Sequence, residues 1–206
     1  MQGVVYMQIK TMVELTTVAI GILVSIEFGY FVKVIIHGIS AKLFLSKVHP
    51  LKSSNIYGLC TTRDIDFMLN HINNGRYLRA MDFGRLDHCI RSGIFKTVYE
   101  TKSKLLVAAS TIRYRKPVYL FVPYRLQSQI VYWDEKNVYY RQDFVTLHDN
   151  FLRATAYVKL AVLGLQTEEL FSLVTSESVT LPEAPNDLIS WINYNKLNSE
   201  SIKKDI

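Results

Sequence analysis

The clearest pattern along the chain is a helical one between Asn74 and Gly93. Apolar residues recur there at intervals of three or four, with charged residues between them, which is typical of a helix that buries one face. Asn74 suits an N-cap, because its side chain can accept hydrogen bonds from free backbone N–H groups. Gly93 suits the left-handed residue that follows the last turn. The pattern therefore predicts a helix over residues 74–93.

Beyond this helix the periodicity changes to that of β-strands. Four segments rich in β-branched and aromatic residues predict strands at Leu105–Tyr114, Arg125–Trp133, Val138–Thr146 and Leu152–Leu163. Polar turns separate the last three, and an extended segment at 57–61 precedes the helix. A helix followed by consecutive antiparallel strands predicts an α+β fold in which the sheet covers the apolar face of the helix. Apolar residues from Leu188 to Leu197 predict a C-terminal helix.

The N-terminal segment from Thr11 to Val32 is almost uncharged and close to the roughly 20 residues that cross a bilayer as a helix. Glu14 and Glu27 interrupt it. Three interpretations remain open: a signal-anchor helix, a cleavable signal peptide that leaves a secreted protein, and an amphipathic or packed helix. Four lysines follow the segment, so the positive-inside preference places the rest of the chain in the cytoplasm.

These patterns divide the chain into four parts. Residues 1–48 form the hydrophobic N-terminal helix and its basic flank, and residues 49–56, which include Pro50, form a linker. Residues 57–166 form the globular domain, and residues 167–206 form a C-terminal extension.

Composition narrows the classes of function. The chain of 206 residues is 49% hydrophobic and carries a net charge of +6. Because the 24 lysines and arginines are spread along the chain, we expect no nucleic-acid partner. A phosphate-rich ligand such as coenzyme A, or an acidic membrane surface, would account for the same charge. The two cysteines and five histidines show no metal-ligand spacing, so neither a metal nor a cofactor is expected.

Candidate chemistry is concentrated just before the predicted helix. Asp64, Asp66, His71, Asn73 and Asn74 fall within eleven residues, between apolar neighbours. Polar groups in such a setting must be hydrogen-bonded to one another or exposed in a cleft. The segment therefore predicts a functional site.

The same segment resembles a known family. Asp66, His71-Ile72-Asn73-Asn74 and Tyr77 are similar to the signature of hot-dog-fold acyl thioesterases. The surrounding residues more closely resemble the thioesterase superfamily member 6 (THEM6) branch, and the resemblance covers about 57–164. It implies a hot-dog fold, in which a curved antiparallel sheet wraps a central helix, usually as a homodimer. It also implies that the protein acts on a fatty acyl-CoA or related acyl thioester at an endomembrane such as the endoplasmic reticulum.

The resemblance also implies roles for individual residues. Asp66 would be the catalytic base or nucleophile, and His71 would orient it or donate a proton. The substrate-binding residues would be Asp64, Asn73, Asn74 and Gly75.

Each of these residues also has a structural alternative. The two aspartates could cap the turns of the loop, Asn74 could cap the helix, and His71 could be a structural histidine. Asp66 precedes His71 by five residues, one more than in many thioesterases of this fold. A second function therefore stays open, in which a catalytically inactive hot-dog domain binds lipid or acyl-CoA or acts as a scaffold.

Overall fold

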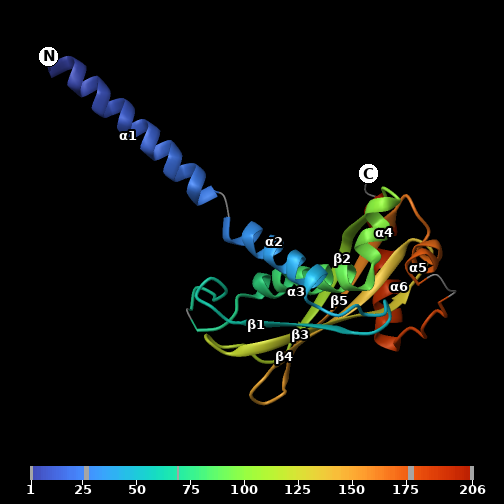
Figure 1. Ribbon diagram of the computed structural model, residues 1–206. Helices are drawn as coiled ribbons and strands as arrows, with labels where there is room; N and C mark the ends of the chain where they lie inside the picture. Colours follow the sequence, from blue (N-terminus) through green and yellow to red (C-terminus); the bar gives the residue numbers. More distant parts are fainter. Residues whose placement is uncertain (1, 26–27, 69, 176–178, 205–206) are drawn as a thin grey trace.

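A computed structural model describes residues 2–25, 28–68, 70–175 and 179–204 of the chain (Figure 1). Five strands form one antiparallel sheet in the order β1-β3-β4-β5-β2. Their bounds are β1 Ser54–Leu59, β2 Lys104–Tyr114, β3 Pro123–Trp133, β4 Asn137–Thr146 and β5 Leu152–Leu163. The helices are α1 Gln2–Ser25, α2 Phe28–Leu43, α3 Asn74–Ser92, α4 Ile94–Glu100, α5 Thr167–Thr175 and α6 Asn186–Lys204.

The central helix α3 packs across the sheet, and the sheet curves around it (Figure 1). Its side chains Tyr77 and Met81 are buried together with Leu126 and Phe144 of β3 and β4. Close approach is possible at Gly84, where a Cβ atom would lie 2.5 Å from Oγ of Ser128. This arrangement is the α+β hot-dog fold that the sequence predicted.

The four predicted strands after the helix are confirmed to within two residues at each end. The end of α3 is also confirmed, because Gly93 has a φ of 87° and its N–H donates to the carbonyl of Ile90. The predicted N-cap is wrong by one residue. Asn73 is the cap, and its side chain accepts a hydrogen bond from the N–H of Gly75.

Other boundaries differ from the sequence pattern. Strand β1 begins at Ser54, inside the predicted linker, because Ser54 pairs with Ser128 of β3. The short helices α4 and α5 were not predicted. Helix α5 covers one end of the sheet, where the rings of Phe171 and Trp133 lie 4.3 Å apart between centroids.

The apolar N-terminal segment contains parts of two helices. Helix α1 ends at Ser25 and α2 begins at Phe28, and Glu27 lies outside the described residues. Helix α2 packs on α3, with the rings of Tyr30 and Phe83 5.5 Å apart. Among the helices that the structure describes, none combines the length and hydropathy required to cross a membrane.

Candidate active site

The loop that precedes α3 is held in place by Asp64. Its Oδ2 accepts hydrogen bonds from the backbone N–H and the hydroxyl of Thr61, at 2.9 and 2.6 Å. Its carbonyl accepts a hydrogen bond from the N–H of Asn73 at 2.8 Å. Asp64 therefore stabilises the turn, as its structural alternative predicted, and Oδ2 is engaged within the protein.

Asp66 and His71 are brought together by the same loop. The N–H of Asp66 donates to the carbonyl of His71 at 2.9 Å, and Oδ2 of Asp66 lies 3.5 Å from Nε2 of His71. The other ring nitrogen, Nδ1, contacts Oδ1 of Asn70, so both nitrogens face oxygen atoms and the ring is fixed. Oδ1 of Asp66 is buried and has no hydrogen-bond partner among the described residues. The side chain as a whole is 11% exposed.

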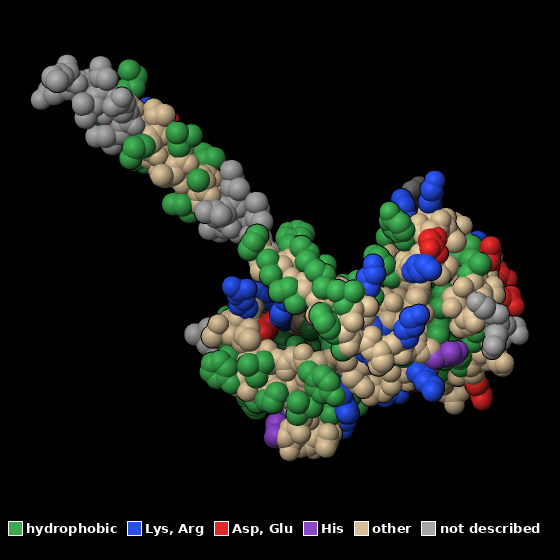
Figure 2. Space-filling model, viewed as in Figure 1, with side chains coloured by type: hydrophobic (Ala, Val, Ile, Leu, Met, Phe, Trp, Pro, Cys, Tyr) green, Lys and Arg blue, Asp and Glu red, His purple; other side chains and the backbone are tan. Residues whose placement is uncertain are grey.

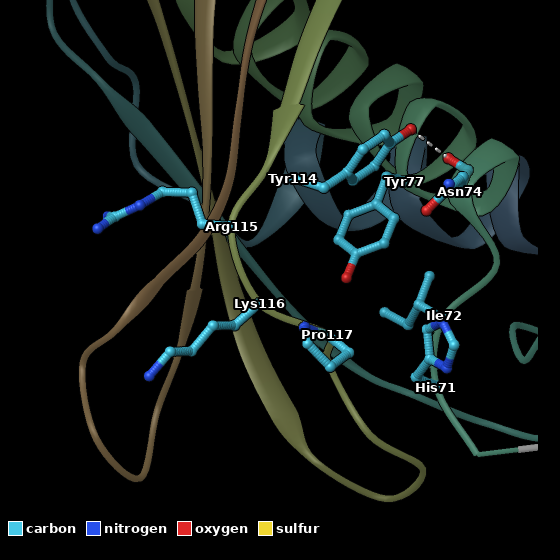
Figure 3. A pocket seen from close by; sticks show the side chains of 8 residues that line it. All are labelled: His71, Ile72, Asn74, Tyr77, Tyr114, Arg115, Lys116 and Pro117. Atoms are coloured by element: carbon cyan, nitrogen blue, oxygen red, sulfur yellow. Dashed lines mark hydrogen bonds between the residues drawn. The ribbon is translucent and has the colours of Figure 1, made fainter.

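A pocket of about 240 Å³ opens beside this pair (Figure 3). Its walls come from the loop, the first turn of α3 and the end of β2, and the lining residues are His71, Ile72, Asn74, Tyr77, Tyr114, Arg115, Lys116 and Pro117. His71 borders the pocket directly. Asp66 contacts His71 but is not one of the residues that line the cavity. The structure thus brings the two predicted catalytic residues into contact, but only His71 lines the pocket.

The first turn of α3 supplies a backbone donor. The N–H of Gly75 donates to Oδ1 of Asn73 and the N–H of Arg76 donates to the Asn73 carbonyl, each at 2.9 Å. The N–H of Asn74 has no acceptor within the described ranges, and Asn74 lines the pocket. Because the start of a helix carries partial positive charge, this N–H is suited to an oxygen that gains negative charge.

Tyr77 belongs to the pocket as well, although its helical position in the sequence indicated a core residue. Both descriptions hold, since the residue is 2% exposed and its ring packs against those of Tyr114 and Phe144. Its hydroxyl oxygen accepts a hydrogen bond from the N–H of Val118 at 3.3 Å. Burial raises the pKa of Tyr77 to about 12, so the phenol stays protonated at neutral pH.

The end of β2 contributes the remaining wall. The hydroxyl of Tyr114 donates to the carbonyl of Asn74 at 2.9 Å, which fixes the strand end to the start of α3. Arg115 and Lys116 follow Tyr114 and are exposed. These residues lie about 40 positions after the loop in the sequence, and no local sequence pattern indicated that they would line the same pocket.

Two other observations complete the site. Asp82 of α3 forms an ion pair with Arg85 of the same helix. No group of three His, Cys, Asp or Glu side chains that could hold a metal ion occurs in the part of the chain that the structure describes.

Comparison with known proteins shows which family this chain is similar to. A sequence profile described as the thioesterase-like superfamily matches residues 60–192. Protein THEM6 of Drosophila melanogaster is 32% identical over 179 residues, which cover 87% of this chain and 92% of that protein. Protein THEM6 of Xenopus laevis is 30% identical, covering 91% of this chain and 92% of that protein.

One solved structure is informative about the fold. The probable thioesterase YbaW of Escherichia coli superposes with a TM-score of 0.55 at 20% identity. The match covers 61% of this chain and 98% of YbaW. By the profile match and the two relatives, the chain belongs to the thioesterase-like superfamily, and its resemblance to the THEM6 branch is confirmed.

Proposed function

We propose that this protein hydrolyses a fatty acyl-CoA or a related acyl thioester, with Asp66 and His71 as its catalytic pair. One observation carries the proposal: the Asp66–His71 pair lies beside a pocket that is also lined by Asn74, whose N–H has no acceptor among the described residues. Thioester hydrolysis requires a donor for the carbonyl oxygen and a carboxylate that activates water or attacks directly. The loop and the first turn of α3 supply both.

In this reaction the carbonyl oxygen of the thioester accepts a hydrogen bond from the Asn74 N–H as it gains negative charge. Asp66, oriented by His71, takes a proton from water as the water oxygen bonds to the carbonyl carbon. The carbon–sulfur bond then breaks, and the departing sulfur takes the proton from Asp66 and leaves as the thiol. Alternatively, Asp66 attacks the carbonyl carbon, the carbon–sulfur bond breaks as the thiolate leaves, and water then hydrolyses the resulting mixed anhydride. Hydrolysis in ¹⁸O-labelled water supports the second route if ¹⁸O appears in Asp66, because water that attacks the aspartyl carbonyl of the anhydride leaves its oxygen there.

A second function, binding of an acyl thioester without turnover, is favoured by the burial of Oδ1 of Asp66. That oxygen is inaccessible in the structure, and Asp66 does not line the pocket. Release of free thiol from a panel of acyl-CoAs, measured beside a ligand-induced shift in melting temperature, distinguishes the two functions. Thiol release supports hydrolysis, whereas a thermal shift without release supports binding alone.

We also propose that the protein attaches to a membrane, and the exposed apolar face of α2 supports this. This helix contacts α3 through Tyr30, Lys33 and His37, whose partners include Phe83 and Asp87. Its opposite side is apolar and exposed, and Figure 2 shows hydrophobic side chains over the helix. These residues are Phe28, Phe31, Ile35, Ile36, Ile39 and Leu43, each at least 50% exposed.

A helix that directs its apolar face outward requires an apolar partner to cover it. We propose a lipid bilayer, because α1 also exposes apolar side chains and Lys42 and Lys47 can contact anionic headgroups. Flotation with anionic vesicles tests this. Glutamate at Phe31, Ile35 and Ile39 is expected to weaken binding. The control is Tyr194→Glu/Leu197→Glu, at two exposed residues of α6. This variant is expected to bind the vesicles as the wild-type protein does.

We further propose an endomembrane location, such as the endoplasmic reticulum, with the domain in the cytoplasm. The lysines that follow the apolar segment support this orientation. Protease treatment of sealed microsomes tests it, since the cytoplasmic domain is expected to be digested. A secreted protein that has lost its N-terminal segment would contradict it.

The functional unit is proposed to be a homodimer. Strand β2 lies at one edge of the sheet and pairs only with β5 among the described strands. Its residues Leu106 and Val107 are 50% and 53% exposed. An exposed apolar edge strand is a template for pairing with a second copy. Light scattering of the detergent-solubilised protein tests this, and a monomeric mass would contradict it.

A further inference from the structure

A cluster of charged side chains lies where α2 packs along α3, away from the candidate active site (Figure 1). The side chain of Asp87 on α3 is 0% exposed, and its Oδ2 accepts a hydrogen bond from Nη1 of Arg91 at 3.1 Å. Nε of Arg91 also donates to the carbonyl of Ser46, just after α2, at 2.9 Å. Arg91 therefore balances the charge of Asp87, but it binds only one of the two carboxylate oxygens.

The other oxygen of Asp87 faces a histidine of α2. Oδ1 lies 3.6 Å from Nε2 of His37, just beyond the distance of a hydrogen bond. Both atoms are buried, and neither has a hydrogen-bond partner among the described residues. A buried carboxylate oxygen without a donor costs free energy. A donor that carries charge at Nε2 would therefore strengthen the contact between the two helices.

Protonation of His37 supplies this donor. Both ring nitrogens of an imidazolium carry a proton, so Nε2 then directs a charged N–H at Oδ1 of Asp87. Salt screens the attraction less than it screens an exposed pair, because Asp87 is buried. Histidine is the side chain that gains or loses its charge between about pH 5 and pH 8. The strength of this contact therefore depends on pH near neutrality.

Other cations of α2 and of the segments packed against it keep their charge over this range. They are Lys33 and Lys42 on α2, Lys47 after it, Arg63 against Gly29, and Arg79 and Arg91 on α3. Positive charges near His37 oppose its protonation by the same amount at each pH. They affect the strength of the contact, but they do not produce its pH dependence.

Two other histidines are close in sequence to the cluster. His88 follows Asp87, but its ring contacts Tyr140 and the carbonyl of Lys52 inside the domain. Burial lowers the pKa of His88, so its protonation at low pH weakens the folded state, which is the opposite direction. His49 is exposed, and its Nδ1 accepts a hydrogen bond from the N–H of Leu51.

We propose that His37 and Asp87 form a pH-sensitive latch between α2 and α3. Protonation of His37 tightens the docking of α2, and loss of that proton loosens it. The direction follows from linkage, because the docked state binds the proton more strongly than the detached state, so docking weakens as pH rises. Helix α2 carries the exposed apolar face described above, and the latch sets how firmly the domain is held to it. This inference goes beyond the proposed hydrolase function and does not depend on it.

The rate of thiol modification in the full-length protein measures how often α2 leaves α3. Ala41 lies one turn after His37 and is 3% exposed, so the thiol of Ala41→Cys reacts when α2 detaches. Ile36→Cys, at a position that is 59% exposed on the same helix, gives the rate for an accessible thiol. The ratio of the two rates removes the effect of pH on the thiol itself. The natural cysteines are both buried, and their background is measured without either substitution.

The ratio is compared at pH 6 and pH 8 in four backgrounds, each with its melting temperature measured. These are the wild type, His37→Gln, Asp87→Asn and the control His148→Gln. His148 is a matched control because its Nε2 lies 3.5 Å from Oδ2 of Asp149, in an exposed pair outside α2 and α3. If Asp87→Asn fails to fold, His37→Gln decides the result.

In the wild type we expect the ratio to rise about threefold or more from pH 6 to pH 8, the effect of losing one ion pair. In His37→Gln and Asp87→Asn the ratio is expected to change less than about twofold, whereas His148→Gln is expected to retain the wild-type rise. A flat ratio in the wild type, or the full rise in His37→Gln, would overturn the proposal. Loss of the rise in His148→Gln would also overturn it.

Discussion

Nδ1 of His88 lies 2.9 Å from the hydroxyl of Tyr140 in the interior of the domain. Nε2 of His88 lies 3.0 Å from the carbonyl of Lys52, which can only accept, so Nε2 carries the proton and Nδ1 accepts from Tyr140. Burial lowers the pKa of His88 below its ordinary value of 6.5. The folded protein therefore holds this ring neutral.

From this pair we predict a loss of stability on acidification. Below about pH 6.5 the unfolded chain binds a proton at His88 that the folded chain does not, so the free energy of unfolding falls as pH decreases. The slope from one such group approaches about 1.4 kcal/mol per pH unit. Urea denaturation at pH 5.5 and 7.5 measures it. His88→Gln is expected to reduce the pH dependence, and an unchanged dependence in that variant would contradict the prediction.

A second prediction concerns the contact between α3 and the sheet. In Gly84→Ala the new Cβ would lie 2.5 Å from Oγ of Ser128 and 3.1 Å from Nε2 of Gln142. That amide donates to Ser128 and to the carbonyl of Met81, so it has little freedom to move. We expect a loss of about 1–3 kcal/mol in the free energy of unfolding.

Gly38→Ala in α2 is the matched control for Gly84→Ala. There the nearest atom, Cδ1 of Ile90, lies 3.9 Å from the new Cβ. Alanine is expected to leave stability unchanged or to raise it by up to about 1 kcal/mol. Equal destabilisation by both substitutions would show that close packing at Gly84 is not the cause.

A third prediction separates the two neighbouring asparagines. Asn73→Ala removes the side-chain acceptor of the Gly75 N–H and is expected to destabilise the protein by about 1 kcal/mol. Asn74→Ala leaves the backbone N–H of that residue in place and is expected to change stability by less than about 0.5 kcal/mol. Thermal denaturation of both variants checks the cap assignment. A larger loss of stability in Asn74→Ala than in Asn73→Ala would show that Asn74 is the cap instead.

The main elements could be predicted because their periodicity is local. The strands from Leu105 to Leu163 are rich in β-branched and aromatic residues, and α3 ends at a glycine that adopts the required positive φ. The N-cap of α3 was placed one residue late because Asn73 and Asn74 both satisfy the cap pattern. Strand β1 extends into the predicted linker because pairing with β3, a distant segment, determines where it begins.

The candidate site was predictable only where its residues are close in sequence. Asp66 and His71 lie in one loop, and the structure brings them together. The cluster of Arg115, Lys116 and Phe151 is formed by segments that antiparallel pairing of β2 with β5 brings together. Recognising it requires knowing the register of two strands. The roles of Asp64 and Asp66 likewise differ only through their hydrogen-bond partners.

The most direct measurement of the central claim is the rate of thiol release from acyl-CoA by wild-type protein, Asp66→Asn and Asp64→Asn. Asp66→Asn retains shape but removes the base, so we expect kcat to fall about 100-fold or more with the melting temperature maintained. Asp64→Asn weakens the hydrogen bonds that hold the turn at Thr61. We therefore expect it to lower the melting temperature and to change kcat less than Asp66→Asn does. Full activity of Asp66→Asn, or no release of thiol by folded wild-type protein from any acyl-CoA, would contradict the account.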